Sequence, residues 1–314
     1  MFHDGPAQTG YDRVENVLDP SNVARLHKAW KYHDAVDPSP AVVGGTVFVE
    51  GYDLEALNAR TGTLMWKVDL GNNFTPSSPA VAYGMVFVGL ATGVSAFDAS
   101  TGVSTWTFPT ANRIDASPAV ADGMVYVPSF DGNLYALDAA TGTLRWALHT
   151  GGYELSNPAV ANGVVYWGSS STTFYALDGA TGAKLWSVPV AVNGLVSPAI
   201  SGGVVYIGGA DGKVYALDAN TGAELWTADV FPNHFTASPV VANGVLYVAS
   251  PSGRLAAVDA VTGATLWRFP AGGAVFSSVA VANGMVYLAS QKGATFAFGL
   301  WPTAAGRRLP RSPR

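Results

Sequence analysis

The feature that most constrains this chain is a unit of about 40 residues that recurs along nearly its whole length. One complete copy, Ser117–Trp146, reads SPAVADGMVYVPSFDGNLYALDAATGTLRW. Copies begin at Ser39, Ser78, Ser117, Asn157, Ser197, Ser238 and Ser278, so successive starts lie 39, 39, 40, 40, 41 and 40 residues apart. Short apolar runs separated by glycine turns at this period are typical of a β-propeller. We therefore predict an all-β fold, a single β-propeller of seven blades.

Each complete copy contains four short apolar runs, which we predict to be four antiparallel strands. In the third copy they are Ser117–Ala121, Met124–Ser129, Leu134–Ala139 and Thr143–Thr150. The first two are separated by Asp122–Gly123, and other copies carry Asn-Gly, Gly-Gly or Tyr-Gly pairs there. Such two-residue turns match the right-handed twist of paired strands. Every blade is thus expected to be a four-stranded antiparallel sheet.

The seventh copy is incomplete, which predicts how the ring closes. Six copies end in Thr-Gly-x-x-x-Trp, at Trp66, Trp106, Trp146, Trp186, Trp226 and Trp267, whereas the copy ending near Leu300 has no tryptophan in register. The segment Leu26–His33 resembles the fourth strand of a copy and contains Trp30. Because an unpaired strand edge promotes aggregation, we predict that Leu26–His33 is the strand that completes the last blade.

The chain divides into three parts on this interpretation. Residues 1–22 form a leading segment, residues 23–300 the seven-bladed propeller, and residues 301–314 a basic tail. Asp19–Leu26 is predicted to be a short helix, with Asp19 as its N-cap and Pro20 in its first turn. The Pro- and Arg-rich tail is expected to be disordered.

Two residue types recur in the six complete copies for structural reasons. An Asp or Asn stands three residues before each Thr-Gly pair, where its side chain can accept hydrogen bonds from turn N–H groups: Asn58, Asp98, Asp138, Asp178, Asp218 and Asp259. Each repeated tryptophan can bury on the order of 200 Å2, or roughly 5 kcal/mol before opposing costs. We expect these tryptophans to pack between blades.

Composition excludes several classes of function. Charged residues are 12% of the chain, the net charge is −5, and no basic run lies inside the repeats, so a nucleic-acid partner is not expected. Cysteine is absent, which excludes disulfides, thiolate metal sites and cysteine nucleophiles but does not define the compartment. No apolar run is long enough for a transmembrane helix. We expect a monomer.

Comparison between the copies predicts where a binding site lies. Connections from the fourth strand of one blade to the first strand of the next share one face with the turns between second and third strands. Sequence varies most on this face, and a propeller pocket usually opens there. The candidate binding residues are the polar members of these connections: Asp37, Asn73, Arg113, Asp115, Glu154, Asn157, Asn193 and His234.

Two kinds of chemistry are open to this set. Asp115, Glu154 and Asn157 come from neighbouring copies and could supply oxygen ligands to a hard cation. Arg113 could pair with an anionic ligand. The competing interpretation is that each is a solvated loop residue. His33, His149 and His234 fall in different copies without ligand spacing, so zinc is not expected.

The string LYALDAATG-x-L-x-W, preceded by SPAVANGVVYVGS-like strands, resembles the pyrroloquinoline quinone (PQQ)-like repeat with its tryptophan-docking motif, over about Trp30–Leu300. The leading TGYDRVENVLDPSNVARLHKAW is similar to the start of bacterial PQQ-like propellers, many of them exported. The resemblance implies an extracytoplasmic protein, periplasmic or secreted, whose leader is not in this chain; a cytoplasmic location is the alternative.

The resemblance leaves two main functions open. Quinoprotein alcohol dehydrogenases of this kind bind PQQ and Ca2+ or a lanthanide, usually on eight blades with long insertions and a vicinal cysteine pair, which this chain lacks. Other members are non-catalytic. We favour a scaffold without a cofactor that binds a protein, peptide or glycan at the variable face. In the alternative, a small quinoprotein dehydrogenase, Asp115, Glu154 and Asn157 hold the metal, and Asp115 or Glu154 acts as base. Asp115 and Glu154 also form the only neighbouring carboxylate pair that we can propose for a glycosidase.

Overall fold

The computed structural model describes residues 30, 32, 39–73, 75–152, 156–169, 173–190, 197–231, 237–271, 279–282, 285–289 and 295–299. Within these ranges the regular structure is β-strand, apart from a short 3-10 turn, η3 (Gly71–Asn73). The predicted all-β class is therefore confirmed. The expected helix Asp19–Leu26 and the tail 301–314 lie outside the described residues.

The strands form antiparallel sheets in the order of the sequence copies. The first sheet contains β1 (Ala41–Val43), β2 (Thr46–Glu50), β3 (Asp53–Asn58) and β4 (Leu64–Asp69). The second contains β5 (Ala80–Ala82), β6 (Met85–Leu90), β7 (Gly93–Asp98) and β8 (Ser104–Pro109). The third contains β9 (Ala119–Ala121), β10 (Met124–Pro128), β11 (Asn133–Asp138) and β12 (Leu144–His149). These last bounds agree with the predicted strands to within three residues.

The remaining copies follow the same plan. The fourth sheet contains β13 (Ala159–Ala161), β14 (Val164–Ser169), β15 (Thr173–Asp178) and β16 (Lys184–Val188). The fifth contains β17 (Ala199–Ser201), β18 (Val204–Gly208), β19 (Lys213–Asp218) and β20 (Glu224–Asp229). The sixth contains β21 (Val240–Ala242), β22 (Val245–Ser250), β23 (Arg254–Asp259) and β24 (Thr265–Pro270). Three described strands form the last sheet: β25 (Ala280–Ala282), β26 (Met285–Ala289) and β27 (Thr295–Gly299).

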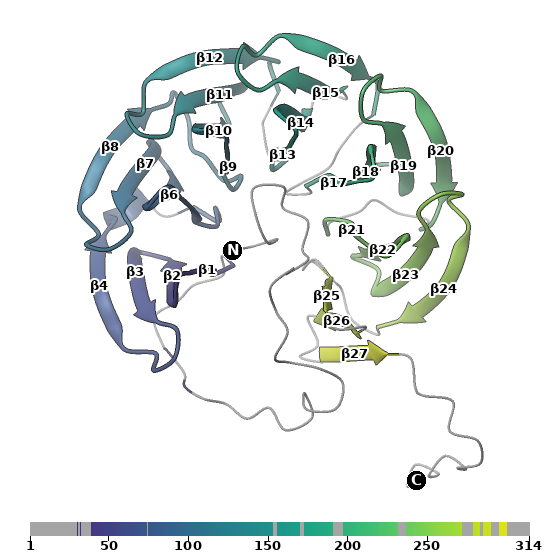
Figure 1. Ribbon diagram of the computed structural model, residues 1–314, viewed down its shortest axis with the longest axis horizontal. Coiled ribbons are helices and arrows are strands. Elements are labelled where there is room, and N and C mark those ends of the chain that lie inside the picture. Colours follow the sequence, from purple (N-terminus) through teal and green to yellow (C-terminus); the bar gives the residue numbers. More distant parts are fainter. Residues whose placement is uncertain are drawn as a thin grey trace, which may run out of the picture.

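The sheets stand side by side around a common centre (Figure 1). The first strand of each sheet is innermost, and the fourth strand of each four-stranded sheet lies at the outer rim. Innermost strands of successive sheets touch in sequence order, from β1 against β5 to β21 against β25. The structure thus has six four-stranded sheets and a three-stranded one in propeller arrangement among its described residues.

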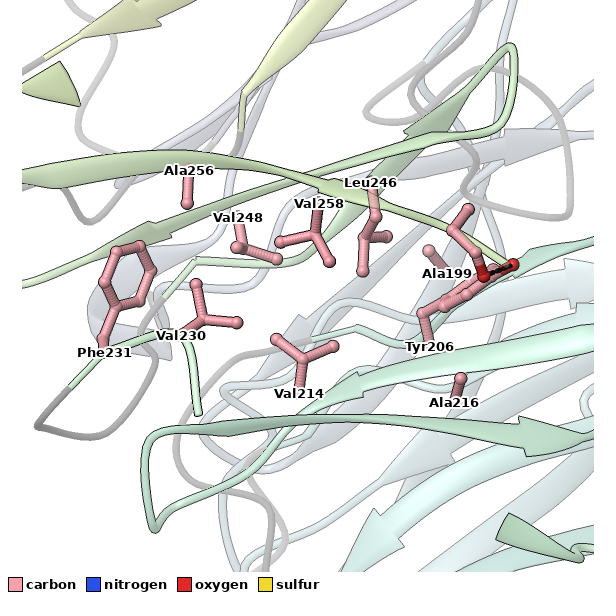
Figure 2. Close-up of a cluster of buried hydrophobic side chains, with 11 residues drawn as sticks. Ala199, Tyr206, Val214, Ala216, Val230, Phe231, Leu246, Val248, Ala256 and Val258 are labelled. Atoms are coloured by element: carbon pink, nitrogen blue, oxygen red, sulfur yellow. Dashed lines mark hydrogen bonds between the residues drawn. The ribbon is translucent and has the colours of Figure 1, made fainter. Parts of the chain in front are cut away.

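The hydrophobic core lies between neighbouring sheets. In one cluster, Val214 of β19 faces Leu246 and Val248 of β22, and all three are fully or almost fully buried. Figure 2 shows these side chains meeting from the two sheets, with Phe231 at one end and Tyr206 at the other. Because both faces of an inner strand are covered in this way, the second and third strands are apolar on both sides.

The two-residue turns adopt the backbone that the sequence predicts. Tyr83, Asp122, Asn162 and Asn243, each followed by glycine, have φ between 49° and 53°. In the first and fifth sheets Gly44 and Gly202 occupy this position, with φ of 57° and 59°. Positive φ at both central residues defines the type I′ hairpin.

A β-bulge in each four-stranded sheet directs the repeated tryptophan toward the next sheet. In the third sheet Ala136 pairs with Trp146 and Leu137 with Leu144, so Arg145 is the extra residue. The Trp146 indole N–H donates to the carbonyl oxygen of Gly179 in the fourth sheet at 2.8 Å. A Cβ atom on Gly182 would lie 2.6 Å from this ring. Glycine in the Thr-Gly pair therefore leaves room for the tryptophan of the preceding sheet.

The same indole contact recurs around the structure. Trp66, Trp106, Trp186 and Trp226 each donate to a turn carbonyl of the following sheet at 2.9–3.1 Å. The turn carboxylates are bound as predicted; Asp138 Oδ1, for example, accepts from the N–H groups of Ala140 and Thr141 at 3.1 and 2.9 Å. Local turn capping by these Asp residues is confirmed.

Trp30 and Tyr32, which precede β1, contact the first sheet in the way that the fourth strand of each sheet contacts the sheet after it. The Trp30 indole N–H donates to the Ala59 carbonyl at 3.0 Å, and a Cβ on Gly62 would lie 2.7 Å from its ring. Two residues on, the Tyr32 hydroxyl donates to Glu55 Oε1 at 3.0 Å. The remaining residues of the predicted strand Leu26–His33 lie outside the described ranges, so its pairing with β27 stays a prediction.

Removing one of these indole rings is expected to destabilise the protein, because the ring belongs to one sheet and packs on the next. Trp146→Ala should lower the free energy of unfolding by about 3–5 kcal/mol, because a large partly buried ring and its hydrogen bond are lost. Trp30→Ala should cost a similar amount. Denaturant unfolding measures both changes.

Leu185→Ala is the matched control, since Leu185 lies beside Trp186 but is 52% exposed. It should change stability by less than about 0.5 kcal/mol. A loss below about 1 kcal/mol in Trp146→Ala would contradict this account of inter-sheet packing.

Candidate functional site

The connections between sheets and the turns between second and third strands lie together, as predicted. The Phe130 N–H donates to the Arg113 carbonyl at 3.0 Å, and the Ile114 N–H donates to the Leu90 carbonyl at 3.1 Å. One connection is therefore bonded to the turns of both sheets that it joins. We call this side the crossover face. The opposite side, formed by the turns β1–β2, β3–β4 and their equivalents, is the hairpin face.

Arg113 and Asp115 form an ion pair on the crossover face. Arg113 Nη2 lies 3.0 Å from Asp115 Oδ2, and the guanidinium stacks on the Phe130 ring with 4.6 Å between its central carbon and the ring centroid. The arginine side chain is 54% exposed and the aspartate side chain 8%. Stacking and pairing orient the arginine while leaving part of its donor edge open to solvent.

The ion pair with Arg113 engages only one of the two carboxyl oxygens of Asp115. Its Oδ1 atom is buried and accepts no hydrogen bond among the described residues. Burial raises the pKa of Asp115, and the positive charge of Arg113 opposes that shift. A buried oxygen with an unused lone pair is uncommon in folded proteins and calls for a specific cause.

Glu50 is a second buried carboxyl on the crossover face. It ends β2 and is 1% exposed, and neither side-chain oxygen has a hydrogen-bond partner in the part of the chain that is described. Burial raises its pKa well above the usual 4.5. Burial therefore disfavours ionisation of this carboxyl, because an unpaired charge in this surrounding would be costly.

Sequence reasoning missed Glu50, although the repeat contains the signal. The equivalent residues of the other six copies are small or lack polar side-chain atoms: Gly89, Pro128, Gly168, Gly208, Ala249 and Ala289. At Gly89 an added Cβ would lie 2.5 Å from Ile114 and 2.9 Å from the Ser77 hydroxyl. A glutamate at this tight position is thus an exception that comparison of the copies could have found.

Asn157 belongs to a hydrogen-bonded belt around the centre. In four sheets, the residue two positions before the first strand donates its N–H to the side-chain oxygen of the corresponding residue in the next sheet. Ser117 donates to Asn157 Oδ1 at 2.8 Å, Ser78 to Ser117 Oγ at 3.0 Å, and Ser39 to Ser78 Oγ at 3.1 Å. Ser197 donates to Ser238 Oγ at 2.9 Å. Asn157 is buried within this belt.

The structure brings together only part of the predicted site. Arg113 and Asp115 are in contact, Asn157 is one sheet away in the belt, and half-buried Asn73 ends η3 on the preceding connection. Asp37, Glu154, Asn193 and His234 lie outside the described residues. Their place in the site stays a prediction.

Asp138 on the hairpin face differs from Glu50 and Asp115, because both of its carboxylate oxygens are bonded. Asp138 Oδ2 pairs with Arg145 at 2.7 Å while Oδ1 caps the turn, and these interactions, that with Arg145 foremost, lower its pKa to about 2. Hydrogen bonds, that with the Ser100 hydroxyl first, likewise lower the pKa of Asp98. Among the described residues, the buried carboxyl oxygens that lack a hydrogen-bond partner are those of Glu50 and Asp115, on the crossover face.

The described residues give limited support to the prediction that Asp115, Glu154 and Asn157 bind a metal ion. Asn157 Oδ1 already accepts the Ser117 N–H and Asp115 Oδ2 already pairs with Arg113, which leaves Asp115 Oδ1 as the open oxygen. No group of three or more His, Asp or Glu side chains suited to a metal ion occurs in the described ranges. Since Glu154 is not among them, the cation and quinone stay predictions.

The four-stranded sheets are arranged around a common centre, and each is formed by one copy of the repeat. This arrangement defines a β-propeller of the PQQ-like class. The family model for "Outer membrane protein assembly factor BamB" matches residues 17–111, 91–234 and 210–300. The chain therefore belongs to the BamB family. A comparison with curated proteins found no match. The described residues contain no helix long and apolar enough to cross a bilayer.

Solved structures share the fold at low sequence identity. BamB from Moraxella catarrhalis is 22% identical with a TM-score of 0.75, and the match covers 87% of this chain and 86% of that one. A quinohemoprotein alcohol dehydrogenase, ADHIIG from Pseudomonas putida HK5, is 18% identical (TM-score 0.67; coverage 79% and 61%). A europium-containing methanol dehydrogenase is 15% identical (TM-score 0.67; coverage 95% and 88%).

Glu50 is expected to make stability depend on pH in a characteristic direction. Above pH 4.5 the unfolded chain releases the proton that folded Glu50 retains, so the free energy of unfolding should fall as pH rises, by up to about 1.4 kcal/mol per pH unit. Glu50→Gln and Glu50→Ala remove this dependence. Their stability relative to the natural chain should therefore increase as the pH rises above about 4.5. Parallel stability–pH profiles for all three proteins would show that Glu50 is not held protonated.

Proposed function

We propose that this protein is a non-catalytic binding scaffold of the BamB family that holds a protein, peptide or glycan on its crossover face. The observation that carries the proposal is the pair of buried, incompletely bonded carboxyls, Glu50 and Asp115, on that face. Groups of this kind lower stability, and natural proteins retain them mainly where function needs them. The exposed donor edge of Arg113 lies beside one of them.

Membership of the family supports the choice of a binding role. The family description names an assembly factor, and the solved structure of that name has the same fold over 87% of this chain. An assembly factor acts through contacts with other proteins. The words "outer membrane" in that description also support our proposal that this chain works outside the cytoplasm, in the periplasm or as a secreted protein. We propose that it does so as a monomer.

We further propose that Leu26–His33 closes a ring of seven blades. Two observations support closure: Trp30 contacts the Ala59–Gly62 turn as Trp66 contacts the Ala99–Gly102 turn, and Tyr32 reaches Glu55 of β3 as Phe108 reaches Tyr135 of β11. A closed ring gives the binding face a rigid base. An unfolding cost for Trp30→Ala below about 1 kcal/mol would argue against closure.

Photo-crosslinking from the two faces tests the binding role. A photo-reactive phenylalanine derivative replaces exposed Asn112 on the crossover face or exposed Ala180 on the hairpin face, and the chain is irradiated in its native host. Discrete adducts are expected from position 112 and not from position 180. Arg113→Glu should reduce the adduct about tenfold, because it removes the oriented donor and repels the same partner group.

Arg145→Glu is the matched control. Arg145 is also 54% exposed and also pairs with an aspartate, Asp138, but on the hairpin face. It should leave the adduct at position 112 unchanged. Equal adducts from both faces, absence of adducts from position 112, or equal effects of the two charge reversals would contradict the proposal.

The alternative is a small quinoprotein alcohol dehydrogenase that uses PQQ with Ca2+ or a lanthanide. What supports it is the open oxygen Asp115 Oδ1 on the crossover face. Asp115, Asn157 and Glu154 would hold the metal, and the bound quinone would accept the hydride of an alcohol while one carboxylate takes its proton.

A titration with PQQ and Ca2+ or a lanthanide decides between the two functions. We expect no bound-quinone absorbance and no dye-linked oxidation of alcohols. Stoichiometric quinone binding with turnover that Asp115→Asn abolishes would replace the scaffold with the dehydrogenase.

A further inference from the structure

A separate hollow lies on the hairpin face, where the fourth, fifth and sixth sheets meet. It has a volume of about 490 Å3 and is lined by the turns β13–β14, β17–β18 and β21–β22 with adjoining residues of the fourth and fifth sheets. This volume falls in the range of natural small-molecule sites. It is on the opposite side of the propeller from Arg113 and Asp115, so it is independent of the function proposed above.

The hollow is open because the fifth sheet turns through two glycines. Gly202 and Gly203 carry no side chain, and an added Cβ on either would meet no atom within 4 Å. In the second sheet Tyr83 stands at the position of Gly202, with nearly the same φ, and its hydroxyl accepts the Gly123 N–H of the next sheet at 3.0 Å. A tyrosine therefore bridges two turns there, whereas the equivalent space beside Gly202 is free.

Uncharged hydrogen-bonding side chains surround the hollow. Asn162, Asn220 and Asn243 contribute amides and Ser201 a hydroxyl, all from exposed positions. None of these four side chains bonds to another described residue. The described lining contains no charged residue.

Aliphatic side chains also line the hollow. Val164, Ile200 and Val241 contribute to it from half-buried positions, next to Tyr166. Amide and hydroxyl groups beside a few aliphatic side chains suit a sugar ring. Such a ring presents hydroxyls at its edge, which hydrogen-bond, and C–H groups on its face, which contact aliphatic groups.

The backbone around the hollow is already paired, which argues against an added peptide strand. The Gly163 carbonyl accepts from Gly179 N–H and the Gly203 carbonyl from Ala219 N–H, at 2.8 and 2.9 Å. The Ala219 carbonyl accepts both the Tyr166 hydroxyl and the Trp186 indole N–H. A strand would need free main-chain groups, whereas the free groups here are side-chain amides.

We propose that this hollow binds a neutral saccharide of one or two pyranose rings. Asn162 and Asn243 hydrogen-bond the sugar hydroxyls from two sides, and Val164, Ile200 and Val241 contact its C–H face. The protein would thus have two binding faces with different chemistry: charged and partly buried groups on the crossover face, and uncharged amides on the hairpin face.

Ligand-observed saturation-transfer NMR on the full chain tests this proposal. The probes are maltose, cellobiose and N,N′-diacetylchitobiose, with glucosamine and glucuronate as charged comparators. At least one neutral disaccharide should bind with about millimolar affinity, because the site is open and its contacts are few. Gly202→Tyr should weaken binding about tenfold or more, since the ring would occupy the hollow as Tyr83 occupies its own turn.

Gly44→Tyr is the matched control. Gly44 has the same place in the first sheet as Gly202 in the fifth, with φ of 57° against 59°, so backbone strain is alike in both variants. It should leave saccharide binding unchanged. If Gly202→Tyr fails to fold, the double substitution Asn162→Ala with Asn243→Ala serves instead, with the same expected loss.

Three results would overturn the proposal. They are no saturation transfer from any neutral probe at about 10 mM, equal binding by the Gly202→Tyr and Gly44→Tyr variants, or a preference for the charged sugars. None of them bears on the crossover face, so the scaffold function is tested separately.

Discussion

Contact between neighbouring sheets is the interaction on which the rest of this structure depends. A four-stranded sheet with two apolar faces cannot be stable alone in water, and here neighbouring sheets cover each other's faces. Val214 against Leu246 and Val248 is one such contact. At the outer rim an indole ring rests on the glycine of the next Thr-Gly turn, and at the centre a belt of serine and asparagine side chains links successive first strands.

Repetition constrains the two faces of the propeller unequally. The hairpin face is built from tight turns that need positive φ and from aspartates that cap them, so its residues are largely dictated by backbone geometry. The crossover face consists of connections whose length is set but whose side chains are free to differ. Exceptions to the repeat are therefore informative on both faces. Glu50 replaces a glycine, alanine or proline on the crossover face, and Gly202-Gly203 replaces the Asn-Gly pair on the hairpin face.

Asp138 on the hairpin face and Glu50 on the crossover face have carboxyl groups in different surroundings. This difference supports our proposal that the two faces have different roles. Asp138 is fully engaged by its turn and by Arg145, and its pKa is lowered to about 2. Glu50 has no such partner, and burial raises its pKa. The first arrangement stabilises a turn, whereas a buried carboxyl without a partner lowers stability, and we propose that Glu50 is retained for the binding role of the crossover face.

The repeat period, the two-residue turns and the Thr-Gly-x-x-x-Trp motif were enough to predict the fold class, the strands to within a few residues and the capping by Asp138, because all of these follow from short-range backbone chemistry. The candidate site was predicted less completely. Arg113 and Asp115 are near neighbours in sequence and were found, but the burial of Glu50, the place of Asn157 in the central belt and the hollow beside Gly202 were not. Each of these depends on what an adjacent sheet places next to the residue, about 40 positions away in the chain. Sequence alone determined which strands form, and the packing of sheet against sheet decided which polar groups are left without partners.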